Sequence, residues 1–182
     1  VQYYANSGLW NCTARVTDDF SIYRVGSNRT NINTLLALEL PNLIDYGIVN
    51  VTEVSDEIYV NVTNVGNTLA NLSLNGYAAT PNDGNAMNCT LGAVKNISIG
   101  YEKYNLTGTN TSVLNLSLFG SLYRNLTSAV NISKFNLAQR QNDAGQYLDD
   151  TNATYWRIYV PLGVAGNCSG NVIFGATQSA GG

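Results

Sequence analysis

The strongest constraint on the fold is an alternation of apolar and polar residues that recurs along the chain. It is seen in Val49-Asn50-Val51-Thr52, Val60-Asn61-Val62-Thr63, Leu72-Ser73-Leu74, Ile97-Ser98-Ile99 and Leu114-Asn115-Leu116-Ser117-Leu118. Residues i and i+2 of a β-strand share one face, so this period puts apolar side chains on a buried face and polar ones on a solvent face. Helical periodicity is nearly absent, and the pattern predicts an all-β chain.

Ten segments are expected to be strands: residues 19–25, 34–39, 46–54, 57–64, 68–79, 87–99, 112–119, 121–132, 155–161 and 170–177. Turn signals rich in Gly, Asn, Asp and Pro separate them. Many short strands at this spacing are typical of a β-sandwich or barrel. Residues 134–150 are polar, and either a long loop or a short helix fits them.

The alternation coincides with an unusual density of Asn-x-Ser/Thr sequons. Fourteen occur, and none has Pro at the middle position, so we expect N-glycosylation. In a strand, the Asn and the Ser/Thr would point outward and the middle residue inward. The fourteen asparagines are Asn11, Asn28, Asn50, Asn61, Asn71, Asn88, Asn96, Asn105, Asn110, Asn115, Asn125, Asn131, Asn152 and Asn167.

The composition limits the cellular location of the protein and the classes of partner that it could bind. Charged residues make up 12% of the chain and the net charge is −3, so solubility would depend on sugars. No basic run provides a phosphate-binding surface, and no apolar run reaches the length of about 18 residues that a membrane-spanning helix needs. The chain begins Val1-Gln2-Tyr3-Tyr4, which we interpret as a mature form whose export signal has been removed. We therefore expect an extracellular protein without nucleic-acid partners or a membrane span.

Three cysteines, Cys12, Cys89 and Cys168, are each the middle residue of a sequon. An exported chain favours disulfides, and an odd number leaves one thiol free or available to a second chain. The spacing does not determine the pairing. Metal binding is a poor alternative because the chain has no His and no CxxC pair.

The residues needed for common catalytic chemistry are missing. Without His, the usual general base and the Ser-His-Asp and Cys-His systems are absent. A glycosidase would need only two carboxylates, but Glu39, Glu53, Asp56, Glu57 and Glu102 form no recognisable motif. Three acidic pairs could bind Ca²⁺ or be solvated loop residues: Asp18-Asp19, Asp56-Glu57 and Asp149-Asp150. We predict a protein that is not an enzyme and needs no cofactor or metal.

The first eighteen residues differ from the rest. They mix large apolar residues with small ones, and Asn6-Ser7-Gly8 interrupts them. They fit either an ordinary first strand or a strand that leaves its own domain and completes a neighbour's sheet. We expect two parts, an extended donor-strand segment at residues 1–18 and a β-sandwich domain at residues 19–182.

On these features the chain resembles the subunits of archaeal thread filaments, the surface pili of Sulfolobus-type thermoacidophiles. The shared features are an N-terminus without the hydrophobic helix of type IV pilins, a very high sequon density, a short-stranded β-sandwich pattern, and a C-terminal stretch at residues 156–176 of the kind seen in such secreted β proteins. The resemblance implies an incomplete, immunoglobulin-like or pilin-like sandwich that a strand of the adjacent subunit completes, head to tail.

The resemblance makes the segment from Val1 to Trp10 the donor, with Gly8 permitting close approach. The residues expected at the donor interface are Val1, Tyr3, Tyr4, Ala5, Gly8, Leu9 and Trp10. The predicted function is a structural subunit of an extracellular glycosylated filament of identical chains, serving adhesion, aggregation or biofilm. The alternative is a monomeric secreted binding module or a surface-layer-associated adhesin.

Overall fold

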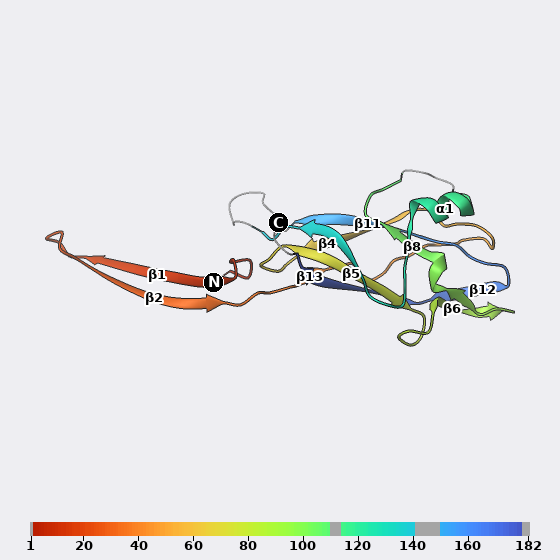
Figure 1. Ribbon diagram of the computed structural model, residues 1–182, viewed down its shortest axis with the longest axis horizontal. Coiled ribbons are helices and arrows are strands. Elements are labelled where there is room, and N and C mark those ends of the chain that lie inside the picture. The colour runs from red at the N-terminus through yellow and green to blue at the C-terminus, as the bar shows by residue number, and fades with distance from the viewer. Residues whose placement is uncertain (1, 110–113, 141–149, 180–182) are drawn as a thin grey trace.

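The chain folds into a β-rich body with a long two-stranded ribbon projecting from one end (Figure 1). The structure is a computed structural model and describes residues 2–109, 114–140 and 150–179. The ribbon consists of β1 (Gly8–Thr17) and β2 (Tyr23–Ile32), which pair antiparallel with each other over their full length. The boundary expected at residue 18 falls in the turn of this hairpin, so the ribbon includes residues on both sides of it.

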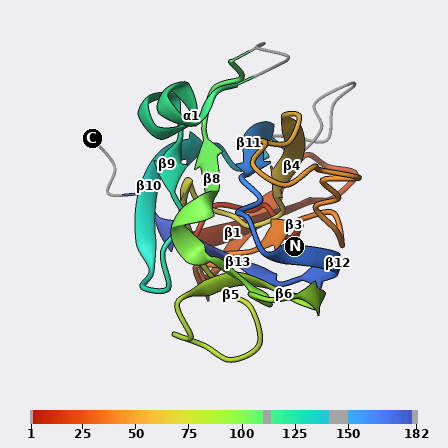
Figure 2. The same cartoon turned by 90° about the vertical axis from the view of Figure 1, so that its right-hand side faces the viewer.

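The body has two main layers, which Figure 2 shows along the long axis from the end opposite the ribbon. One layer is a five-stranded sheet in the order β3-β4-β11-β8-β9. Its strands are β3 (Leu38–Glu39), β4 (Ile58–Asn64), β8 (Glu102–Asn105), β9 (Arg124–Asn125) and β11 (Thr151–Ile158).

The facing layer is a three-stranded sheet in the order β10-β5-β13. A smaller sheet, β12-β6-β7, continues the body at the end far from the ribbon (Figure 1). The strands are β5 (Ala70–Tyr77), β6 (Asn85–Gly92), β7 (Asn96–Ser98), β10 (Asn131–Leu137), β12 (Val164–Ser169) and β13 (Asn171–Gln178), and a 3-10 turn spans Ile99–Tyr101. An all-β class is therefore confirmed.

Both main sheets bury the apolar half of their alternating sequence against each other. In β5 every second residue is buried, as its pattern of apolar and polar residues predicts. Trp156 lies at the centre of the core, fully buried, with its ring beside those of Tyr104 and Phe174. Its indole N–H donates to the Thr154 hydroxyl at 2.8 Å, so its polar atom is satisfied. The main cluster joins both layers and comprises Val60, Val62, Leu72, Leu74, Tyr104, Leu126, Phe135, Leu137 and Trp156.

Two of the expected strands are wrong. Part of the strand expected at residues 112–119 is instead the helix α1 (Leu116–Leu122), because Asn115 caps it: its side-chain oxygen accepts from the Leu118 amide at 2.9 Å. Within residues 46–54 only Val54 makes a strand-like bridge, to Tyr159. Gly47 and Thr52 have φ angles of 65° and 67°, which break an extended chain.

Helices have a minor role in the described part of the chain. The helix α1 has seven residues, and none of the described helices is long and apolar enough to span a membrane. Phe119 and Tyr123 are four residues apart, so they lie on the same side of α1. Both are buried against the outer face of the five-stranded sheet.

We predict that Leu74→Ala, in the centre of β5, lowers the free energy of unfolding by about 3 kcal/mol, because it removes buried methyl groups and leaves a cavity between the layers. Chemical denaturation followed by tryptophan fluorescence measures the loss. The control is Leu162→Ala, at a side chain that is 71% exposed, and it should change little. Equal effects of the two substitutions would contradict the assigned core.

Candidate assembly surface

The ribbon is exposed on both faces. No residue of β1 or β2 is buried, and only Ile32 at its base is half-buried. In an antiparallel pair, directly opposite residues share a face, so the register assigns each side chain to one side of the ribbon. An isolated two-stranded ribbon is marginally stable by itself. A surface that buries one of its faces would therefore stabilise it.

The two faces of β1 differ in polarity. Trp10, Cys12, Ala14 and Val16 lie on one face, whereas Asn11, Thr13, Arg15 and Thr17 lie on the other, together with a single large apolar residue of β1, Leu9. Val16 is 71% exposed and Trp10 is 44% exposed, so much of this apolar row is open to solvent. On the polar face, the Arg15 guanidinium lies 4.2 Å from the centroid of the Tyr23 ring. We name the Trp10, Cys12, Ala14 and Val16 row the apolar face of β1.

The residues expected at the donor interface fall into two groups in the structure. Gly8, Leu9 and Trp10 belong to the ribbon, whereas Tyr3, Tyr4 and Ala5 precede it at its base. That base contacts the chain's own body: Asn67 Nδ2 donates to the Ala5 carbonyl at 3.0 Å, and the Arg140 guanidinium lies 5.2 Å from the Tyr4 ring. The projecting element is therefore the hairpin from Gly8 to Ile32. Val1 lies outside the described residues.

The body has an open side where both sheets end without a further strand. Among the described residues, β13 pairs only with β5, and β4 pairs with β3 only at Thr63 and Asn64. Strand-sized edges of this kind offer free N–H and C=O groups to an added strand. Residues 40–51 lie beside this side without forming a strand, and they line cavities of about 220 and 620 Å³.

A buried carboxyl faces the smaller cavity. Glu102 is 2% exposed, and its Oε1 accepts from the Tyr46 hydroxyl at 2.8 Å. Burial raises the pKa of Glu102 to about 7, although the hydrogen bond from Tyr46 lowers it. The pKa of Tyr46 is raised as well, by burial and by the nearby Glu102.

A second polar cluster lies under α1 on the outer face of the five-stranded sheet. Arg157 is 1% exposed; its Nε donates to the Tyr123 hydroxyl at 3.0 Å and its Nη1 to the Ser55 carbonyl at 2.8 Å. Tyr123 and Thr109 both donate to Glu57. Burial acts to raise the pKa of Glu57, but these hydrogen bonds and the charge of Arg157 outweigh it and lower the pKa. The polar groups of this cluster form hydrogen bonds with one another, and the cluster holds α1 on the sheet.

Three of the carboxylates considered for Ca²⁺, those of Asp18, Glu57 and Asp150, accept hydrogen bonds from the protein itself. Asp18 Oδ1 accepts from the amides of Phe20 and Ile22 in the ribbon turn, and Asp150 Oδ2 accepts from the Ala138 amide. Asp149 lies outside the described residues. Within the described ranges, no three Asp, Glu or Cys side chains form a group that could hold a metal ion.

Most sequon asparagines are accessible. Of the thirteen that the structure describes, eleven are exposed, while Asn71 and Asn105 are half-buried; Asn110 lies outside the described residues. The middle residue of the sequon points inward, as predicted, in β4, β5, β6 and β7. These residues are Val62, Leu72, Cys89 and Ile97, and all four are buried. The prediction fails in β10, where Ile132 is 62% exposed and Ser133 points inward to the Tyr104 hydroxyl at 2.9 Å. It also fails in the ribbon, which has no buried face.

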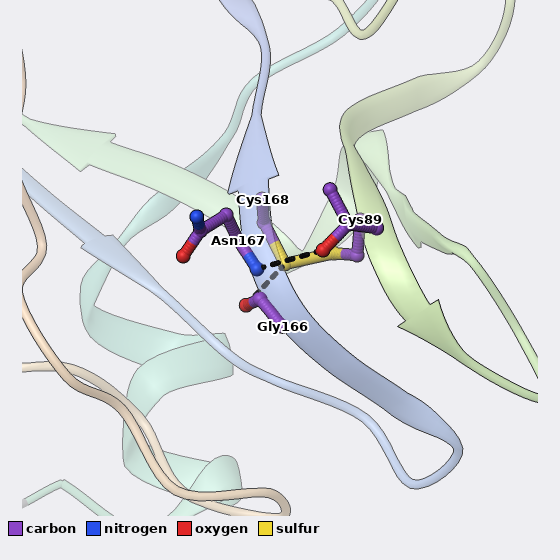
Figure 3. The surroundings of a disulfide bond; sticks show 5 residues. Cys89, Gly166, Asn167 and Cys168 are labelled. Atoms are coloured by element: carbon purple, nitrogen blue, oxygen red, sulfur yellow. Dashed lines mark hydrogen bonds between the residues drawn. A yellow bond between two sulfur atoms is a disulfide. The ribbon is translucent and has the colours of Figure 1, made fainter.

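The cysteine pairing, which spacing left open, is Cys89 with Cys168 (Figure 3). The two residues lie directly opposite each other in β6 and β12, which are 79 residues apart in sequence. A disulfide that closes a loop of this length lowers the entropy of the unfolded chain and thereby stabilises the folded state by about 4 kcal/mol. A disulfide is compatible with the expected exported location. Cys12 is a free, exposed thiol on the apolar face of β1.

We predict that stability falls as pH rises from about 4.5 to about 7. The folded state holds the Glu102 proton up to about pH 7, whereas the unfolded state loses it near 4.5, so folding becomes less favourable by about 3 kcal/mol across this window. Thermal unfolding from pH 4 to pH 8 measures the change. Glu102→Gln should flatten it, and Glu39→Gln, at an exposed carboxylate, should not. A slope that persists in Glu102→Gln would refute this assignment.

Known proteins give no guide to the function. Comparison with protein families, with curated proteins and with solved structures found no match.

Proposed function

We propose that the chain is the subunit of an extracellular, N-glycosylated filament in which the ribbon of each subunit completes the β-sandwich of the next. The observation that carries the proposal is the apolar face of β1, which projects from the body and on which Val16 is 71% exposed. An exposed row of this kind in a short strand is typical of a segment that adds to another sheet.

The shape of the molecule favours head-to-tail contact. The ribbon leaves one end of the body, and β6 and β12 lie at the opposite end (Figure 1). That far end exposes the apolar side chains of Leu91, Val94 and Leu162, which are 61%, 51% and 71% exposed. A contact between two different surfaces extends into an open filament unless the rotation between subunits closes a ring.

The lengths of the two elements also fit. β1 has ten residues, which span about 33 Å when extended. The open strand β13 has eight residues, and its inner face carries Val172 and Phe174 next to the core. Addition of β1 to such an edge would satisfy free backbone groups and cover the apolar row together.

The sugars fit a filament with a protected surface. Exposed sequons lie in both main layers, at Asn61 and Asn152 in one and at Asn131 in the other. Glycans at these positions would keep a surface with few charges soluble and would direct association to the ribbon and the open side.

We predict that Val16→Asp abolishes filaments and that Thr17→Asp preserves them. The two neighbours receive the same new charge on opposite faces of β1, and only Val16 is on the apolar face, where burial of a carboxylate is costly. Negative-stain electron microscopy of the purified chain measures filament formation. Because the ribbon is separate from the core, both variants should unfold at the temperature of the parent chain. Filaments of Val16→Asp, or an equal loss in both variants, would refute the proposal.

The ribbon also gives a prediction about glycan occupancy. Asn11 is on the polar face, whereas Asn28 lies directly opposite Cys12 on the apolar face. A glycan on Asn28 would obstruct the surface that must be buried, so we expect assembled subunits to carry sugar at Asn11 and none at Asn28. Glycopeptide mass spectrometry of purified filaments measures both sites. A fully occupied Asn28 in filaments would contradict the assigned donor face.

A further inference from the structure

Residues 40–51, which we name the strap, occupy the open side of the sandwich without pairing to either sheet. They follow β3 directly, and no strand forms before β4. Within the described part of the chain, no backbone–backbone hydrogen bond involves residues 41–49. The hydrogen bond of the Gly47 amide is local, to the side chain of Asp45. A segment with so few main-chain partners is weakly fixed.

The strap is also loosely packed. The smaller cavity lies between it and both sheets, since Val60 of β4 and Phe174 of β13 line it together with Ile44. The larger cavity lies along the second half of the strap, and Ile158 and Val164 line it from the far end of the body. Leu43, Ile44 and Tyr46 border both cavities. Well-packed interiors leave little unfilled space, so this side of the sandwich is incompletely filled.

Few contacts hold the strap in place. Leu40, Ile44 and Tyr46 pack against the core, and the hydrogen bond from Tyr46 to Glu102 joins the strap to β8. The other large side chains face solvent, with Leu43 74% and Ile48 100% exposed. A net gain of about 1 kcal/mol per hydrogen bond would let a paired strand of several residues outcompete such a segment.

We propose that the strap is a displaceable placeholder, which covers the open side of the free subunit and gives way when β1 of a second copy pairs there. The inference rests on the proposed function, because the incoming strand is the ribbon of the neighbouring subunit. The strap would shield the open edges of β4 and β13 before assembly, which reduces unwanted edge-to-edge pairing. The contacts of Ile44 and Tyr46 would then set how readily a subunit accepts its neighbour.

The test uses the full chain with Val16→Asp, which cannot donate its ribbon but keeps its acceptor side. A fluorescent peptide with the sequence of residues 8–17 is titrated against it, and binding is measured by fluorescence anisotropy. Ile44→Ala is then added to weaken the strap, and Ile48→Ala is the matched control at a fully exposed residue of the same strap. We expect Ile44→Ala to bind the peptide at least fivefold more tightly than Ile48→Ala, because less strap contact is lost on binding.

A second readout needs no strap variant. Chymotrypsin cleavage after Tyr46, which is half-buried, should accelerate when the peptide is added to the Val16→Asp chain. Equal affinities of the two strap variants, together with an unchanged cleavage rate, would overturn the placeholder while leaving the filament proposal standing. Failure of the peptide to bind any of the three chains would overturn both.

Discussion

Face-to-face burial of two sheets around Trp156 is the interaction on which the rest of the structure depends. It uses one face of each strand, so the other face remains available to water and to sugars. Val60, Val62 and Trp156 from one layer meet Leu72, Leu74 and Phe135 from the other. The Cys89–Cys168 disulfide fixes the adjoining sheet at the far end, where a second, smaller cluster packs. Among the residues that the structure describes, packing between the layers leaves the edge of each sheet beside the strap without a further paired strand.

The fold buries the ionisable side chains of Arg157 and Glu102 in different ways. Arg157 is almost fully buried, and its guanidinium donates to the Tyr123 hydroxyl and the Ser55 carbonyl, with Glu57 held by the same tyrosine. Glu102, by contrast, accepts a hydrogen bond from the Tyr46 hydroxyl, and burial keeps it neutral below a pKa of about 7. A buried carboxyl that is most stable when protonated gives a fold that strengthens as the solution becomes moderately acidic. This direction is opposite to that of a salt-bridged carboxylate.

In the proposed filament, glycosylation and association would make opposite demands on the same strands. Sugars require exposed asparagines, whereas a strand that enters a neighbour needs one face free of them. The ribbon shows the conflict directly, because Asn11 and Asn28 lie on opposite faces of one hairpin. The body avoids it, since exposed sequons in β4 and β11 leave the inner faces of both strands to the core. In the proposed filament, selective occupancy of the ribbon would decide which face is available.

The sequence by itself determined the β class, the strands at residues 57–64, 68–79 and 170–177, and the outward position of most sequon asparagines. These follow from a period of two, which is a local property of the chain. The tertiary structure decided what depends on partners distant in sequence: that Cys89 lies opposite Cys168, that Ser133 rather than Ile132 points inward in β10, and that Gly8–Thr17 pairs with Tyr23–Ile32 in a projecting hairpin. Alternation cannot distinguish a core strand from a ribbon exposed on both faces, and in the short stretch at Leu116 the Asn115 cap and the contacts of Phe119 and Tyr123 favour a helix. Register and layer contacts are set by the whole fold, so no single stretch of sequence contains them.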